Sequence, residues 1–325
     1  MSRVATVDIG TNSVLLLVAE YTENAWHAVL ERATVTRLGQ GVDRTRTLHP
    51  DAIARTIACL SQYADEARRA GVGQCIVVGT SAMRDASGAD VLRAYVRDAF
   101  GTEVRVLSGN EEARATYTGA RSGLDIDAEC TVFDIGGGST EFVVGGASGP
   151  VFSHSFDVGA VRMTERHIRH DPPTRHELES LERDVRARFA EHEVPACGPI
   201  LGVAGTVTTL CAWLHGVVPY DGAKVHGQRI TRAEIARAYA TLASMPLAQR
   251  GALGGLDPKR ADVIVAGAAI TLACLDILGG TELVASDRGV RWGLLSELGE
   301  AQPRARITNP ASAARSDPRA RHSKL

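Results

Sequence analysis

Short apolar segments alternate with stretches of helical periodicity along the first 125 residues. Apolar residues at every second position, or in unbroken short runs, indicate strands, whereas apolar residues three or four positions apart indicate helices. Pro50 can begin one such helix, Gly71 ends it, and Ser87 is placed to cap the next. The pattern predicts three strands, a helix, a strand, a helix, a strand and a helix, over residues 3–9, 14–19, 26–36, 50–70, 75–78, 87–100, 104–107 and 110–121.

A similar pattern begins again at Cys130. Strands are predicted over 130–135, 141–145, 151–156, 200–203 and 282–285, and helices over 161–170, 175–192, 206–215, 232–244, 260–278 and 289–298. Both copies place Asp-Ile-Gly at the end of an apolar strand, before a turn of small residues and another strand. This recurrence predicts an α/β fold with two duplicated domains, 1–125 and 126–300, and a cleft between them.

Composition fits two ordinary globular domains. The chain has 325 residues, of which 44% are hydrophobic and 23% charged, and it contains no apolar run of bilayer-spanning length. The N-terminus passes almost directly into a predicted strand, so we expect no signal peptide, no membrane partner and a cytoplasmic protein. The six cysteines include no Cys-x-x-Cys pair, which argues against zinc and disulfides.

The formal net charge of −2 gives no overall attraction to nucleic acid, so we expect no nucleic-acid partner. Positive charge gathers near the C-terminus, where six Arg and Lys residues lie among Pro, Ala and Ser between Pro303 and Leu325. That composition predicts a disordered basic tail over 301–325, with polyanion binding as the alternative.

Two matched turns carry the first candidate chemistry. Asp8-Ile9-Gly10-Thr11-Asn12-Ser13 and Asp134-Ile135-Gly136-Gly137-Gly138-Ser139-Thr140 place successive N–H groups and hydroxyls where phosphate oxygens can be received. Either turn alone could be an ordinary glycine-rich hairpin, but two facing copies could hold a chain of phosphates from both sides. Their Asp residues suit Mg²⁺, with Mn²⁺ as a substitute, because such ions take one or two carboxylates plus substrate phosphates.

A second candidate segment is Ser108-Gly109-Asn110-Glu111-Glu112-Ala113-Arg114. Two carboxylates at a helix start could activate a water, or they could simply stabilise the helix dipole. Arg84, after the apolar strand at 75–78, could bind a phosphate or lie on the surface. The sequence pattern alone leaves both pairs of alternatives open.

At these residues the chain resembles the exopolyphosphatase and guanosine pentaphosphate phosphatase family (Ppx/GppA), within the actin-like, ribonuclease H-like superfamily. The resemblance is collinear and also covers Gly79-Thr80-Ser81-Ala82-Met83-Arg84, Gly202-Val203-Ala204-Gly205-Thr206 and Arg260-Ala261-Asp262-Val263-Ile264. The Ser-Gly-x-Glu-Glu-Ala element is the discriminating one, because the glycine loops recur across the superfamily. The resemblance implies two actin-like domains and hydrolysis of terminal phosphoanhydride bonds.

The resemblance also implies roles for individual residues. Glu112 would be the base or would orient the attacking water, with Glu111 the weaker candidate. Asp134 and Glu141 would act in catalysis and, with Asp8, hold the metal ion. The remaining residues would bind the substrate's phosphates: Asn12, Ser13, Arg84, Gly137, Gly138 and Ser139.

Two departures and several alternatives accompany the resemblance. The chain lacks the C-terminal helical domains of longer members, which makes shorter polyphosphates the expected substrates, and it has Trp292 where those enzymes often have an acidic residue. The leading interpretation is an exopolyphosphatase. A guanosine pentaphosphate phosphatase, an actin-like kinase and a non-catalytic sensor of polyphosphate or alarmone are the alternatives. A homodimer is expected from the resemblance.

Overall fold

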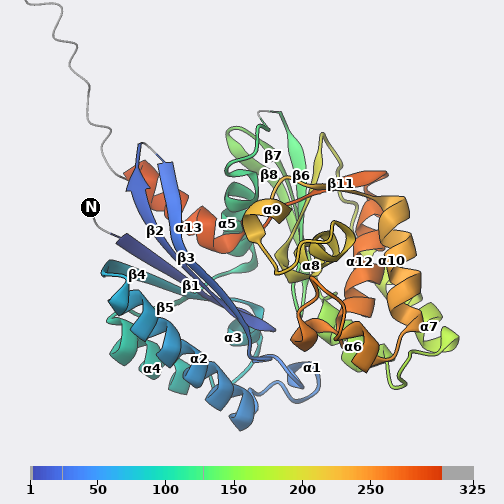
Figure 1. The fold of residues 1–325 in the computed structure, drawn as a ribbon, viewed down its shortest axis with the longest axis horizontal. Helices are drawn as coiled ribbons and strands as arrows, with labels where there is room; N and C mark the ends of the chain where they lie inside the picture. Colours follow the sequence, from blue (N-terminus) through green and yellow to red (C-terminus); the bar gives the residue numbers. More distant parts are fainter. Residues whose placement is uncertain (1–2, 24, 127, 302–325) are drawn as a thin grey trace, which may run out of the picture.

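The computed structural model describes residues 3–23, 25–126 and 128–301, which form two β-sheets with helices packed around them (Figure 1). The segment 302–325, which contains nearly all of the predicted basic tail, lies outside the described residues. No described helix is long and apolar enough to cross a bilayer.

The first sheet has the strand order β3-β2-β1-β4-β5. Strand β1 pairs antiparallel with β2 and parallel with β4. Leu60 and Tyr63 of helix α2 are fully buried in the core that this helix shares with the sheet. The elements of this half are β1 (Arg3–Ile9), β2 (Ser13–Thr22), β3 (Ala25–Val35), α1 (Val42–Thr45), α2 (Pro50–Arg69), β4 (Val72–Gly79), α3 (Ser81–Asp85), α4 (Asp90–Phe100), β5 (Val104–Val106) and α5 (Gly109–Arg121).

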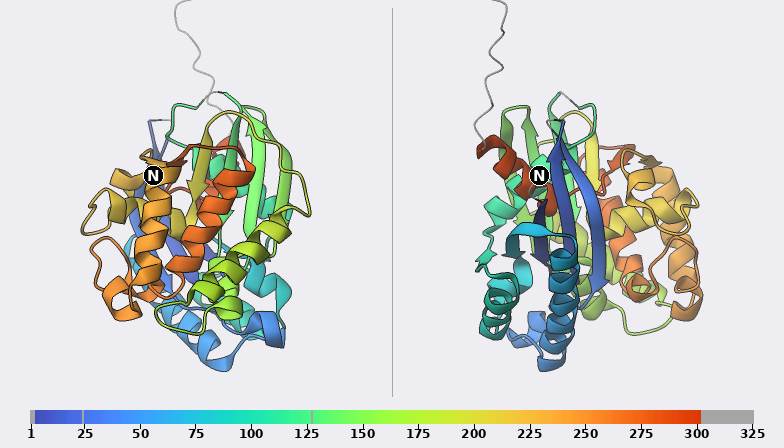
Figure 2. Two further views of the ribbon diagram at one scale, coloured as in Figure 1. Left: turned by 90° about the vertical axis from the view of Figure 1, so that its right-hand side faces the viewer. Right: turned by 60° about the vertical axis from the view of Figure 1, so that its left-hand side comes forward.

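The second sheet has the order β10-β11-β9-β6-β7-β8. Figure 2 shows two of its helices, α10 and α12, side by side and away from the first sheet. The strands are β6 (Cys130–Ile135), β7 (Thr140–Gly146), β8 (Gly149–Phe156), β9 (Ile200–Val203), β10 (Arg229–Thr231) and β11 (Glu282–Ala285). The helices are α6 (Ala160–His167), α7 (Arg175–Phe189), α8 (Ala204–Leu214), α9 (Gly222–Val225), α10 (Arg232–Ser244), α11 (Leu247–Arg250), α12 (Ile264–Ile277) and α13 (Val290–Ala301).

The two sheets repeat one topology. In the first, β3, β2 and β1 form an antiparallel meander beside the parallel strands β4 and β5. In the second, β8, β7 and β6 form the same meander beside the parallel strands β9 and β11, and β10 adds an antiparallel edge strand. The predicted duplicated α/β fold is confirmed.

Several predicted elements differ in detail from those observed. Ser87 does not cap α4, which has Ala89 at its N-cap, because Ser87 instead pairs with the segment at Arg46 and Thr47. Helix α12 begins at Ile264 rather than at Arg260, since residues 258–260 form a 3₁₀ turn. The elements that no prediction included are at most five residues long, too short for periodicity to show: α1, α3, α9, α11 and β10.

The last described helix returns to the first sheet. Helix α13 packs along α5 and against β1, and a Cβ on Gly119 of α5 would lie 2.0 Å from the carbonyl oxygen of Gly289. Only glycine allows so close an approach of the two backbones. Trp292 is buried here against the first sheet, and the Arg288 guanidinium lies 4.0 Å above its ring. The domain boundaries at 125 and 300 stay predictions.

Candidate active site

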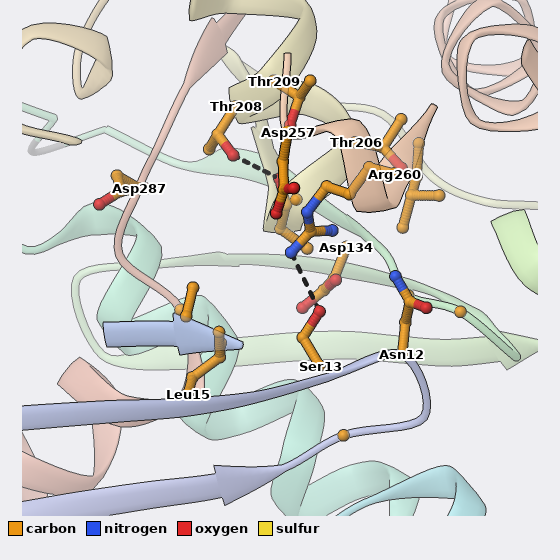
Figure 3. Close-up of a pocket in the computed structure, with 18 of the residues that line it drawn as sticks. Asn12, Ser13, Leu15, Asp134, Thr206, Thr208, Thr209, Asp257, Arg260 and Asp287 are labelled. Carbon is orange, nitrogen blue, oxygen red and sulfur yellow. Dashed lines mark hydrogen bonds between the residues drawn. The ribbon is translucent and has the colours of Figure 1, made fainter. Parts of the chain in front are cut away.

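A cavity of about 980 Å³ lies between the two halves and is lined by both. Residues of the β1–β2 turn form one wall, and residues of the β6–β7 turn and of α8 form others. Figure 3 shows side chains from these elements around the same space, among them Asn12 and Ser13 of the first half and Asp134 and Thr206 of the second. A cavity of this size has room for several linked phosphates.

The two turns have the same backbone hydrogen bond. Gly10 N–H donates to the Ser13 carbonyl over 3.0 Å, and Gly136 N–H donates to the Ser139 carbonyl over 2.9 Å. The turns also touch each other, since a Cβ on Gly137 would lie 3.2 Å from both the Thr11 methyl group and the Asn12 Cβ. The predicted pair of facing phosphate-sized turns is therefore present in the structure.

The strand registers place the carboxylates. Asp134 at the end of β6 lies opposite Glu141 of β7, so both side chains extend from neighbouring strands beside the turn. In the first half, Asp8 at the end of β1 lies opposite Leu15 of β2. All four residues line the cavity, and Glu112 of α5 joins them there.

Burial raises the pKa of each of these carboxyl groups. Desolvation raises the pKa of Asp134 and of Glu112 well above its usual range, and neighbouring Glu141 and Asp8 add repulsion. The pKa of Asp8 rises to about 6 for the same reason, with the Arg291 charge acting in the opposite direction. The pKa of Glu141 is also raised by burial, although the Ser155 hydroxyl donates to its Oε1 over 2.7 Å. Four such carboxyls in one cavity need a cation or shared protons to coexist.

The two glutamates at the start of α5 have different environments. Glu111 completes a capping box with Ser108, accepting its N–H over 2.9 Å, and is largely exposed. Glu112 is 9% exposed and faces the cavity. The helix-capping interpretation therefore applies to Glu111, and it leaves Glu112 available for chemistry.

Arg84 lies beside Glu112 rather than on the cavity wall. Its guanidinium donates to Glu112 Oε2 over 3.0 Å and to the Leu107 carbonyl over 2.8 Å. It is not among the described residues that line the cavity. In this geometry Arg84 orients Glu112 and favours its ionised form, and direct contact of Arg84 with phosphate stays a prediction.

The remaining predicted phosphate ligands all line the cavity: Asn12, Ser13, Gly137, Gly138 and Ser139. A further cation reaches them from the second half, because Arg260 donates to the Ser13 hydroxyl over 3.1 Å (Figure 3). No role for Arg260 was predicted from sequence, although Arg260 opens one of the motifs that carry the family resemblance. Its position became clear only from a contact between residues 247 positions apart.

The described residues contain no group of three His, Cys, Asp or Glu side chains arranged to enclose a metal ion. One carboxylate oxygen is nevertheless available, because Asp8 Oδ1 is buried and has no hydrogen-bond partner. Mg²⁺ commonly binds through one or two carboxylates, several waters and the substrate's phosphates. The donor set therefore fits an ion that binds together with substrate, and the charge of such an ion would let the crowded carboxyls ionise.

Comparison with known proteins identifies the chain. The family model described as "Ppx/GppA phosphatase family" matches residues 17–301. This chain belongs to the Ppx/GppA phosphatase family. The match begins within β2, after the first turn. It includes the Ser-Gly-x-Glu-Glu-Ala element, the second turn with its strands, and the helices up to α13.

Individual relatives agree with this membership. "Exopolyphosphatase 2" of Mycobacterium tuberculosis is 39% identical over 284 residues, which cover 83% of this chain and 89% of that protein. "Exopolyphosphatase 1" of the same organism is 28% identical over 299 residues, covering 90% and 87%. The crystal structure of the Aquifex aeolicus Ppx/GppA family member has 34% identity and a TM-score of 0.79, covering 93% of this chain and 99% of that one.

These findings confirm the predicted family, the actin-like two-domain fold and the assignment as a hydrolase of phosphoanhydride bonds. Metal dependence is general in the family, and the comparisons do not name the ion.

Proposed function

We propose that this chain is an exopolyphosphatase, which removes the terminal orthophosphate of inorganic polyphosphate by attack of water. One structural observation carries most weight: two matched turns face each other across a cavity that also contains Glu112, Asp134 and Glu141. The named exopolyphosphatase relative at 39% identity supports polyphosphate as the substrate class. The cytoplasmic location and the homodimer stay predictions.

The two turns would hold the terminal phosphates. Backbone N–H groups of Gly137 and Gly138 and the hydroxyls of Ser13 and Ser139 are suited to bind phosphate oxygens, and Arg260 adds a positive charge beside Ser13. Phosphoryl transfer depends mainly on alignment and charge neutralisation, so these contacts account for much of the expected rate enhancement.

Glu112 would accept a proton from the attacking water. Burial raises the pKa of Glu112 above the usual range of a glutamate, so its carboxylate takes up a proton more readily, which suits a general base, and Arg84 holds that carboxylate in one orientation. Asp8, Asp134 and Glu141 would hold Mg²⁺ or Mn²⁺, which when bound supplies charge neutralisation at the phosphates. The proton from water then resides on Glu112, and orthophosphate separates from the shortened chain.

Guanosine pentaphosphate is the second candidate substrate, since its 5′-terminal phosphate presents the same anhydride to the same residues. The family name includes both activities. A catalytic centre that contacts only the last phosphates does not discriminate between the two compounds.

The test measures orthophosphate release with Mg²⁺ from polyphosphates of several lengths and from guanosine pentaphosphate. We expect stepwise release from polyphosphate, with a higher kcat/KM than for the nucleotide. Preference for guanosine pentaphosphate would assign the second candidate. Tight binding of polyphosphate without release from any compound would instead indicate a sensor, and phosphate transfer from ATP to a sugar would indicate a kinase.

A further inference from the structure

An enzyme that shortens a chain from its end has to release a product from the blind end of its site. In the proposed reaction, the cut orthophosphate would lie at the carboxylates, and the rest of the chain would lie between it and the mouth of the cavity. Orthophosphate then leaves either after the shortened chain has dissociated or by a separate route. The first option ends each binding event after one cut.

The structure contains a second, small cavity of about 20 Å³ behind the two turns. Four residues line both this rear cavity and the main cavity: Thr11, Ser81, Gly137 and Gly138. The wall between the two cavities is therefore formed by the tips of the turns and by the start of α3. The other residues of the rear cavity lie away from the main cavity: Gly39, Val42, Ala82, Asp85, Val161, Arg162 and Glu165.

We propose that the rear cavity is the exit route for orthophosphate, which passes between the tips of the turns while the shortened chain stays in the main cavity. The proposal rests on the proposed exopolyphosphatase function and concerns how that reaction's product leaves.

The walls of the rear cavity are held by contacts between the two halves, which a small domain movement would break. Glu165 of α6 accepts the Gly41 N–H over 3.3 Å beside the start of α1, and these two helices are neighbours in Figure 1. On the inner side, Thr11 of the first half and Gly137 of the second half are only in packing contact, which a domain movement can separate. A space of 20 Å³ holds about one water molecule, so orthophosphate needs this widening to pass.

Charged residues around the rear cavity are already paired. Arg162 is buried, donates through Nε to the Gly138 carbonyl over 2.6 Å, and has its Nη2 3.5 Å from Asp157 Oδ1. Asp85 lies 3.7 Å from the Arg84 guanidinium. Paired charges hold a passing anion only weakly, which suits passage rather than storage.

Two neighbouring valines allow a matched test. Val161 and Val263 belong to one apolar cluster and are each 8% exposed, but Val161 lines the rear cavity whereas Val263 lines the main one. Val161→Phe, and independently Val42→Phe, would fill the rear cavity. Val263→Phe adds the same volume on the substrate side.

The experiment compares two rates on polyphosphate of defined length. Chemical quench measures the rate of cleavage, and a fluorescent phosphate-binding protein measures the rate at which orthophosphate is released into solution. In Val161→Phe and Val42→Phe we expect cleavage in a single turnover near the wild-type rate, release slower by about tenfold, and a burst of enzyme-bound orthophosphate. Products on a gel should shift from processive to distributive shortening. Val263→Phe should raise KM without a burst.

Release that keeps pace with cleavage in both rear-cavity variants would overturn the proposal. If both variants also slow cleavage itself, the deciding variant is Glu165→Ala. It removes the contact of Glu165 with the Gly41 N–H, so orthophosphate release should become faster. An unchanged release rate would overturn the exit route. Failure of the wild-type enzyme to cleave polyphosphate would contradict the proposed function instead.

Discussion

The turns of the two halves share the same backbone hydrogen bond but differ in the residue that faces their aspartate. Asp134 lies opposite Glu141, whereas the equivalent Asp8 lies opposite Leu15. At the strand ends beside the turns, the second half therefore places two carboxylates and the first half one, Asp8, whose Oδ1 has no hydrogen-bond partner. We infer that the two turns have diverged: the strand ends of the second half provide two of the carboxylates for the metal ion, whereas those of the first half provide one, and the first half adds Glu112 from α5.

The largest expected effect on kcat in this comparison comes from replacing Glu141 by leucine, the residue found at the equivalent position of the first half. Glu141→Leu should lower kcat by about 10³-fold, because it removes one of the two neighbouring carboxylates at the second turn. Orthophosphate release at saturating Mg²⁺ and polyphosphate measures the change. A kcat within tenfold of wild type would contradict the inferred division between the halves.

The paired aspartates give a finer comparison. Asp134→Asn should lower kcat by more than Asp8→Asn, by about a further tenfold, since it removes one of the two carboxylates that lie side by side on β6 and β7. The apparent Mg²⁺ affinity should fall in both variants. Equal losses of kcat would show that the two copies contribute alike.

The raised pKa of Asp8 predicts that the free energy of unfolding depends on pH. Its pKa is about 6 in the folded chain and 3.8 ordinarily, so the folded state favours the protonated carboxyl, and the wild type loses stability as pH rises through this window. At 1.36 kcal/mol per pKa unit the loss approaches about 3 kcal/mol above pH 6. Without metal, Asp8→Asn should raise the unfolding free energy at pH 8 more than at pH 4.

Urea unfolding with a chelator at both pH values measures this difference. An equal change at pH 4 and pH 8 would mean that Asp8 is not desolvated in solution as the structure indicates. Added Mg²⁺ should reduce the benefit of Asp8→Asn at pH 8, because the ion compensates the wild-type carboxylate.

Much of this site was predictable from sequence, because it depends on short local patterns. A strand ending in Asp-Ile-Gly before small residues specifies the turn, and Ser-Gly-x-Glu-Glu-Ala specifies a capped helix start. Other features depend on contacts between distant residues. Sequence spacing gave no indication that Arg84 binds Glu112, that Arg260 reaches Ser13 or that Trp292 packs against the first sheet.

The smallest expected effect concerns the contact between the halves at Ser13. Ser13→Ala removes the acceptor for Arg260, and Ser139→Ala is its counterpart in the second turn. Loss of one hydrogen bond to a charged group should weaken substrate binding by about 1.5–3 kcal/mol. We expect the change mainly in KM for Ser13→Ala, and a change confined to kcat would contradict a holding role for the first turn.

The central claim is that Glu112, and not its neighbour, activates water at this site. The most direct measurement is single-turnover cleavage of polyphosphate by Glu112→Gln and Glu111→Gln, with substrate binding measured in parallel. We expect Glu112→Gln to lose about 10³-fold in cleavage with binding intact, and Glu111→Gln to keep nearly wild-type cleavage. Retained cleavage in Glu112→Gln, or an equal loss in both variants, would contradict the assignment.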